Sequence, residues 1–187
     1  MIEEIENITI KEFFSLEENK LLELYRILRL IKSDGRHIQS IQLLSYKDVV
    51  QLKQLCTIQT PINIIAIIEG VFEIPLKQQR EMKLTEYFPL LNFVINGIEE
   101  IIEMEHIRLS STAKDDLIMA GVELLNQYGD IATIDALAGG DILRWQQIEL
   151  LPWQIVFTKL CMDKDKAQIQ ENYLEIIKNK NTTNAHS

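Results

Sequence analysis

Cysteine and long hydrophobic runs are scarce in this sequence. Its 187 residues include only Cys56 and Cys161, which lie in apolar stretches and form no C-x-x-C pair, so we expect two buried, reduced thiols. The longest apolar run, residues 62–72, is too short to span a bilayer and contains Glu69. The chain opens with MIEEIEN, which is acidic where a secretory signal peptide is basic. We therefore expect a soluble intracellular protein without membrane contact.

Positive charge is in deficit, and histidine is rare. The 19 lysine and arginine residues face 28 aspartate and glutamate residues, which gives a formal net charge of -9. A chain with this charge repels phosphate backbones, so we expect no nucleic-acid partner. The 3 histidines leave few candidates for general acid–base catalysis, and the common hydrolase, phosphate-loop and zinc-protease motifs are missing. We therefore expect neither enzymatic activity nor a cofactor.

Glycine and proline are also few, with 7 and 4 residues, and helix-forming Leu, Ile, Glu, Lys and Gln take their place. No segment alternates at period two, as a half-buried strand would. The sequence therefore predicts an all-α protein: a multi-helix bundle over residues 1–109, a smaller C-terminal helical unit over residues 110–180, and a loose polar tail over residues 181–187.

Short polar motifs predict where the helices of the bundle begin. Three pairs have the spacing or residue types of helix starts: Ser15 with Glu18, Ser45 with Asp48, and Thr60 with Pro61. The helix after Pro61 is apolar nearly all round, which is typical of the central helix of a bundle. The longest pattern opens at Thr85 and could reach Arg108, with Pro89 tolerated in its first turn.

Glycine and proline set the elements of the C-terminal unit. Residues 110–112 are expected to break the long helix and to cap the next one, which residues 128–130 stop. The pair Gly139-Gly140 ends a short helix over residues 134–138, and Asp141 caps the segment that follows. Pro152 prevents a continuous helix and starts the last long one. An anion could bind at the start of the helix after Gly140, but Asp141 would repel it.

Two other functions remain as alternatives. Glu103 and His106 have the Glu-x-x-His spacing of carboxylate-bridged di-iron bundles, which would suit a small helical metal-binding enzyme, although no second copy of the motif exists. Residues 36–55 could form a DNA-binding helix-turn-helix with a turn near Ser45, and Lys47 and Lys53 could touch phosphate. Positive charge in that segment is thin and unclustered, unlike the usual electrostatic footprint.

Both tryptophans stand close together around Pro152. Trp145 lies on the short segment before the proline, while Trp153 and Phe157 follow it on one face of the last helix. One interpretation is a local aromatic core that fixes the angle between the two segments. The other is that a tryptophan contacts a partner, because tryptophan is enriched among interface hot spots, and we favour Trp145 for this role.

The apolar pattern of the last helix lapses and then returns. It is interrupted over residues 162–168 (MDKDKAQ) and resumes at Ile169, Tyr173, Ile176 and Ile177. A helix that becomes apolar again after a polar interval has to bury the second patch against another surface. This pattern predicts a protein that binds a partner or assembles with itself.

Residues 136–177 resemble the C-terminal part of small helical proteins from tailed-bacteriophage morphogenesis modules, which encode tail assembly chaperones and the ring or neck proteins between portal and tail. Asp141, Trp145, Leu151 and Pro152 are the nearest match to an aspartate-tryptophan-leucine-proline segment of the chaperones. The resemblance implies a non-enzymatic protein that binds itself or other tail or portal proteins, in the host cytoplasm during assembly or in the virion. The partner-binding residues we expect are Trp145, Trp153, Phe157, Ile169, Tyr173 and Ile176.

Overall fold

The computed structural model describes residues 7–35, 38, 40–110 and 121–184. All the secondary-structure elements in these ranges are α- or 3-10 helices. Within them, Thr9 and Lys83 form an isolated antiparallel bridge. The predicted all-α fold is therefore confirmed. The chain divides into two compact units, Met1–Ile102 and Glu103–Ser187. The division lies inside the long helix α7 (Leu84–Leu109), whereas the sequence analysis places it after that helix, at residue 109.

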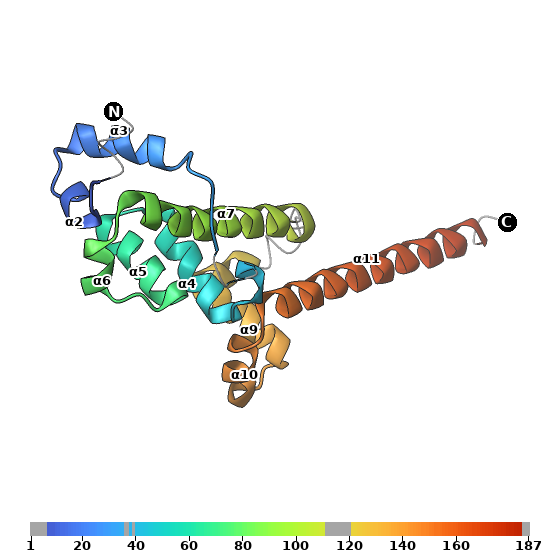
Figure 1. Cartoon of the computed structure of the whole chain (residues 1–187). Coiled ribbons are helices and arrows are strands. Elements are labelled where there is room, and N and C mark those ends of the chain that lie inside the picture. The colour runs from blue at the N-terminus through green and yellow to red at the C-terminus, as the bar shows by residue number, and fades with distance from the viewer. Residues whose placement is uncertain (1–6, 36–37, 39, 111–120, 185–187) are drawn as a thin grey trace. The chain divides into compact units, whose positions relative to one another are not determined.

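The first unit packs its other helices around the buried face of α7 (Figure 1). In chain order these elements are α2 (Ile10–Phe13), α3 (Glu18–Leu28), the 3-10 turn η1 (Ile41–Leu43), α4 (Tyr46–Thr57), α5 (Pro61–Phe72) and α6 (Leu76–Glu81). The rings of Phe13 and Tyr25 meet Phe88 edge to face, with centroids 5.6 and 5.7 Å away. Since α7 carries more buried side chains than its neighbours, it is the central helix of this unit.

Helix α5 does not take the central place that its composition predicts. Ile64, Ile67 and Ile68 are buried on one face, but Ile62 is 78% exposed. The start of this helix agrees with the prediction: Pro61 is its first residue, and the Thr60 hydroxyl accepts a hydrogen bond from Asn63. An apolar composition therefore predicted that α5 is a helix and where it begins, but not how much of its surface is covered.

The capping box near the N-terminus lies earlier than predicted. The Glu12 carboxylate accepts a 2.8 Å hydrogen bond from the Thr9 backbone N–H, and the Thr9 hydroxyl accepts one from the Glu12 N–H. Ser15 instead donates its hydroxyl proton to the Glu12 carbonyl, and α3 begins without a side-chain cap. The box at Ser15 is thus wrong, whereas the Ser45 cap of α4 is confirmed by its bond from the Asp48 N–H.

Pro89 stands beyond the first turn of α7, because the helix begins at Leu84. Its carbonyl accepts a 2.9 Å hydrogen bond from the Asp34 N–H, which joins the segment after α3 to α7. The helix itself spans nearly the range predicted from Thr85 to Arg108. A proline at this position has no N–H to donate to the carbonyl of the preceding turn, so the helix lacks one of its backbone hydrogen bonds there.

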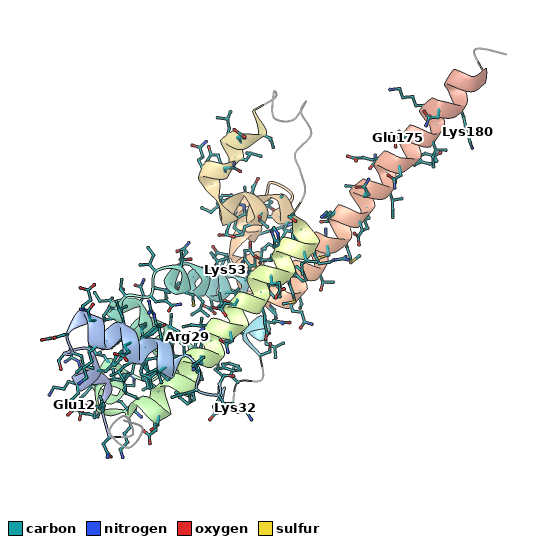
Figure 2. The ribbon with its side chains drawn as sticks, turned by 90° about the horizontal axis from the view of Figure 1, so that it is seen from above. Glu12, Arg29, Lys32, Lys53, Glu175 and Lys180 are labelled. Atoms are coloured by element: carbon teal, nitrogen blue, oxygen red, sulfur yellow. The ribbon has the colours of Figure 1, made fainter. Side chains whose placement is uncertain are left out.

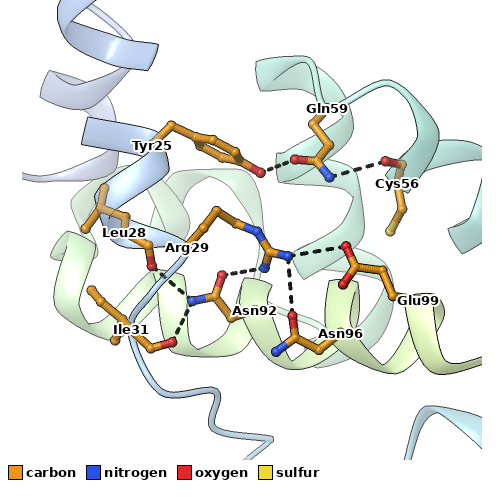
Figure 3. Close-up of polar contacts among 9 residues, drawn as sticks. All are labelled: Tyr25, Leu28, Arg29, Ile31, Cys56, Gln59, Asn92, Asn96 and Glu99. Atoms are coloured by element: carbon orange, nitrogen blue, oxygen red, sulfur yellow. Dashed lines mark hydrogen bonds and ion pairs between the residues drawn. The ribbon is translucent and has the colours of Figure 1, made fainter. Parts of the chain in front are cut away.

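The end of α3 is capped by a buried side chain from α7 (Figure 3). The amide of Asn92, which has no exposed surface, donates to the carbonyls of Leu28 and Ile31 at 3.0 and 2.8 Å. The guanidinium of Arg29 donates to the Asn92 side-chain oxygen at 2.7 Å and also reaches Asn96. The Leu28 carbonyl also accepts from the Ile31 N–H, and the Asn92 amide adds the side-chain donor that ties the end of α3 to α7.

The second unit contains the end of α7 and a series of shorter elements before one long helix. They are η2 (Val122–Tyr128), α9 (Asp130–Ala138), η3 (Ile142–Arg144), α10 (Trp145–Glu149) and α11 (Trp153–Asn184). Gly139 and Gly140 end α9 with φ of 68° and 78°, a conformation that glycine adopts without strain. Asp141 caps the next turn by accepting a 3.0 Å hydrogen bond from the Leu143 N–H.

These boundaries agree with the prediction, with three differences. Helix α9 begins at Asp130, four residues before the predicted start at Ile134. Helix α11 continues to Asn184, so part of the tail predicted to be loose is helical. Residues 122–128 form a 3-10 helix, where the pattern had predicted the end of an α-helix. The predicted cap at residues 111–112 and the start of the helix after it lie outside the described residues.

Candidate functional site

Trp153 lies in the interior of the second unit, at the first position of α11. Its side chain is 1% exposed, and its indole N–H donates a 2.9 Å hydrogen bond to the Glu105 carboxylate near the end of α7. Its ring stacks on the half-buried ring of Phe157, with centroids 4.7 Å apart. Trp153 is therefore not free to contact a partner, contrary to the sequence prediction, because its surface and its only donor are already used within the chain.

Trp145 is placed differently from Trp153. It is half-buried, and its indole N–H donates a 3.2 Å hydrogen bond to Asp135 on α9. One side of its ring lines an open hollow of about 430 Å³, together with mostly apolar side chains of η2 and α9: Leu125, Tyr128, Ile131, Ala132 and Ala136. The two tryptophans therefore have separate roles, since one is core and the other borders a surface depression.

The polar interval of α11 covers the end of α7. The Lys164 ammonium donates 2.9 Å hydrogen bonds to the backbone carbonyls of Arg108 and Ser110. The Arg108 guanidinium forms a 3.3 Å ion pair with Asp165. A lysine at the C-terminal end of a helix satisfies unpaired carbonyls and is favoured by the helix dipole. This contact accounts for Lys164 and Asp165 within the polar interval of residues 162–168.

Beyond this contact α11 extends as a helix on its own (Figure 1). Every side chain from residue 165 to residue 180 is exposed, and Figure 2 shows Glu175 and Lys180 projecting from this outer half. The predicted partner-binding residues there, Ile169, Tyr173 and Ile176, are 67, 61 and 53% exposed. No described side chain covers them, so three apolar residues of the predicted site remain open on one helix.

Two further exposed apolar residues continue this face toward the start of α11. Ile155 and Met162 are 54 and 49% exposed and lie on the side of the helix that faces away from Trp153. With Ile169 and Ile176 they form a row at intervals of seven residues, which we name the α11 stripe. The sequence analysis missed Ile155 and Met162 because it followed the buried face of the helix, although their spacing from Ile169 is visible in the sequence.

The residues of the metal-binding alternative are not brought together with further ligands. Glu103 and His106 are both exposed on α7. Within the described residues, no group of three or more His, Cys, Asp or Glu side chains is arranged to hold a metal ion. The Glu-x-x-His spacing therefore has no second half in this part of the structure.

The helix-turn-helix alternative also lacks its first helix in the described part of residues 36–55. Residues 41–43 form one 3-10 turn, and only α4, from Tyr46 onward, is an α-helix. Lys47 is exposed and Lys53 is half-buried on that helix. A recognition helix needs a second helix packed across it, and η1 is too short to serve as one.

No protein-family model, no curated protein and no solved structure matches the chain. Separately, no helix among those described combines the length and apolar content that crossing a bilayer needs.

The exposed half of α11 carries three apolar residues of the predicted site, Ile169, Tyr173 and Ile176, among polar and charged side chains. Burying an isoleucine that is half exposed removes apolar area from water and needs no defined chemistry. Charged side chains, Glu171, Glu175 and Lys178, lie between the apolar ones on this half of the helix.

Proposed function

We propose that this protein is a non-enzymatic interaction component of phage assembly or virion structure, either a tail or neck ring protein or a tail assembly factor. It acts through apolar helical interfaces, and its partners are copies of itself or other tail or portal proteins. The observation that carries the proposal is the open apolar surface of α11, with Ile169, Tyr173 and Ile176 each more than half exposed.

The energetics of α11 support binding as the role of this surface. A helix gains most of its stability from the packing of its apolar face, and the outer half of α11 has no such packing among the described residues. Covering each half-exposed isoleucine contributes on the order of 1 kcal/mol, as an upper estimate. Several such residues on one helix therefore offer a partner a small apolar contact.

The hollow beside Trp145 supports a second contact in the same unit. Its lining is apolar apart from Asp135, which already accepts the indole N–H. Tyr128 and Ile131 at its rim are 54 and 48% exposed. Aromatic residues around an apolar depression are typical of interface hot spots, so a partner side chain could occupy it.

The phage context rests on the resemblance of residues 136–177 to morphogenesis proteins. In that context the protein acts in the host cytoplasm during assembly and, if it is a ring or neck component, stays in the virion. The net charge of -9 favours protein partners over packaged nucleic acid, because like charges repel.

The experiment compares the full chain with its Ile169→Lys/Ile176→Lys variant. Both are tagged and recovered from lysates of the natural source, and bound proteins are identified by mass spectrometry, together with the polypeptides of purified virions. We expect the chain in virions, or bound to a tail, neck or portal protein that the variant loses. A chain that is absent from virions and loses no partner in the variant would contradict the proposal. Stoichiometric iron, or salt-dependent DNA binding, would favour the two alternatives instead.

A further inference from the structure

We propose that the α11 stripe pairs with the α11 stripe of a second copy of this chain, in an antiparallel two-helix coil. The stripe consists of Ile155, Met162, Ile169 and Ile176. The proposal rests on the proposed function, since it names the partner and the geometry of one of its apolar helical interfaces.

The spacing of the stripe indicates what kind of surface covers it. Its residues follow one another at intervals of seven, and each is between 49 and 67% exposed. In a straight helix of 3.6 residues per turn, such a row drifts by about 20° per interval. It stays in line with a neighbouring surface only if two helices wind around each other. The spacing therefore points to another helix as the occupant rather than to a flat surface or a pocket.

The stripe occupies one side of α11. The opposite side of the helix holds Trp153 and Val156, which are 1 and 2% exposed. An open hollow of about 410 Å³ lies beside Ile155 and Met162, lined also by Thr158 and Lys159. The side of α11 that packs on its own unit and the side that carries the stripe are thus different, and both can be covered at once.

A second set of residues completes the seven-residue pattern. These residues lie four positions after each stripe residue and are Lys159, Lys166, Tyr173 and Lys180. In a parallel, in-register pair, each lysine would face the same lysine of the second copy, so three layers would place like charges together. Like charges in contact disfavour that arrangement. A parallel pair of this sequence is therefore penalised three times.

An antiparallel pair avoids the repeated lysines. The pair is centred between Lys166 and Ile169. Each stripe residue of one copy then faces, in the second copy, one of the residues that lie four positions after a stripe residue: Ile155 faces Lys180, Met162 faces Tyr173, Ile169 faces Lys166, and Ile176 faces Lys159. The aliphatic stem of a lysine covers an isoleucine while its ammonium reaches water. All positions of the pattern find their counterparts within residues 155–180, and a two-fold axis relates the two copies, as in most homodimers.

The contact extends over one segment of α11. Residues 155–180 span about 38 Å of helix at 1.5 Å per residue. One face of this segment carries the eight residues of the seven-residue pattern and the side chains that flank them, which is fewer than the roughly 20–30 residues on each side of a standard interface. The contact is thus a small one, and it is formed without any residue of the first unit.

The test begins with the oligomeric state of the full chain, measured by sedimentation equilibrium. We expect a dimer, and we expect Ile169→Lys to raise its dissociation constant by at least roughly tenfold. Leu174→Lys is the matched control, because Leu174 is 57% exposed on the same half of α11 but lies away from the stripe. It should leave the dimer intact. Circular dichroism at a concentration where both variants are monomeric should show the same helix content, since neither side chain is buried within its own chain.

Cysteine pairs then test the orientation. In the antiparallel pair, a Lys159→Cys chain mixed with an Ile176→Cys chain should form a mixed disulfide, because those positions face each other. Ile176→Cys alone should form none across the stripe, because its two copies would lie about 25 Å apart. The natural Cys56 and Cys161 are present in the unmodified chain, which serves as the background control.

Each other outcome overturns the pairing. A self-linked Ile176→Cys dimer would mean a parallel pair. A chain that stays monomeric at about 50 µM would mean that no second copy covers the stripe. If that monomer still loses a tail or portal protein on Ile169→Lys, the proposed function stands and only the self-pairing fails. If Ile169→Lys changes neither the oligomeric state nor the set of captured proteins, both the self-pairing and the proposed function fail.

Discussion

The indole nitrogen of Trp153 and the carboxylate of Glu105 lie 2.9 Å apart, although 48 residues separate them in the chain. This bond joins the first turn of α11 to the last turns of α7 within the second unit. It also uses the one polar group of a side chain that is otherwise buried. Trp153 therefore positions α11, and the exposed apolar side chains of Ile155 and Met162 lie on the other side of that helix.

We predict that Trp153→Ala strongly destabilises the second unit. The change empties a buried aromatic site and removes the indole hydrogen bond to Glu105, so the expected loss is about 3–5 kcal/mol in the free energy of unfolding. Urea titration followed by circular dichroism measures it without relying on tryptophan fluorescence. Glu105→Gln keeps an acceptor for the indole and should cost much less. A loss below about 1 kcal/mol for Trp153→Ala would be inconsistent with its burial.

Trp145→Ala is predicted to affect association more than folding. The ring is half-buried and borders the hollow lined by Leu125 and Ile131, so its removal should cost only about 1–2 kcal/mol of stability. Binding of the partner identified by mass spectrometry should weaken by roughly tenfold or more. The two losses are measured side by side on one preparation. A collapse of the melting transition with unchanged binding would instead make Trp145 a core residue.

The difference between the two tryptophans could not be predicted from the sequence. Both stand on apolar faces of neighbouring helices, and local spacing treats them alike. The two side chains differ in their hydrogen-bond partners, since Trp153 donates to Glu105 and Trp145 donates to Asp135. Only the folded chain brings these carboxylates to the tryptophans. The caps that were predicted correctly, at Ser45, Thr60 and Asp141, depend on residues two or three positions away. Local chemistry therefore fixed where helices begin, and distant contacts fixed what each face does.

The N-terminal capping box illustrates the same limit. Thr9–Glu12 and Ser15–Glu18 both have the required spacing, yet only the first forms. The bridge between Thr9 and Lys83 holds the first pair in place, and it joins residues far apart in sequence. The α11 stripe is the opposite case, since its seven-residue interval could have been found in the sequence.

We predict that Asn92→Ala destabilises the first unit by about 2–3 kcal/mol. The change removes the amide donor from the Leu28 and Ile31 carbonyls, of which Leu28 keeps only its bond from the Ile31 N–H, and it leaves the Arg29 guanidinium without its nearest acceptor. Asn96→Ala is the matched control, because Asn96 is exposed and accepts from the same arginine at 3.3 Å. It should cost less than about 0.5 kcal/mol. Equal losses in urea titrations of the two variants would rule out the capping role of Asn92.

Cys56 is predicted to react slowly with thiol reagents at neutral pH. Burial raises the pKa of the Cys56 thiol to about 11, and the nearby Glu99 carboxylate adds to the effect. Because the thiolate is the reactive form, alkylation should accelerate as pH rises toward that value. The unfolded chain loses this proton first, near pH 8.5, so the thiol's contribution to stability is full below about pH 8.5 and falls as pH rises toward the folded pKa.

The measurement is the alkylation rate of the full chain at several pH values. Subtracting the rate of Cys56→Ala, which retains Cys161, isolates the thiol of interest. A midpoint near pH 8.5 would show that Cys56 is exposed to water in solution.

Lys166→Leu is predicted to strengthen the self-association of α11. In the antiparallel pair Lys166 lies in the two central layers, where its stem covers Ile169 but its charge resists burial. Leucine would fill the same space without a charge, so the dissociation constant of the dimer should fall by roughly tenfold or more. Lys178→Leu makes the same chemical change on a face away from the stripe and should leave the constant nearly unchanged. If both variants associate more tightly by the same factor, the gain comes from lost charge or added apolar surface alone, and the stripe is not the contact.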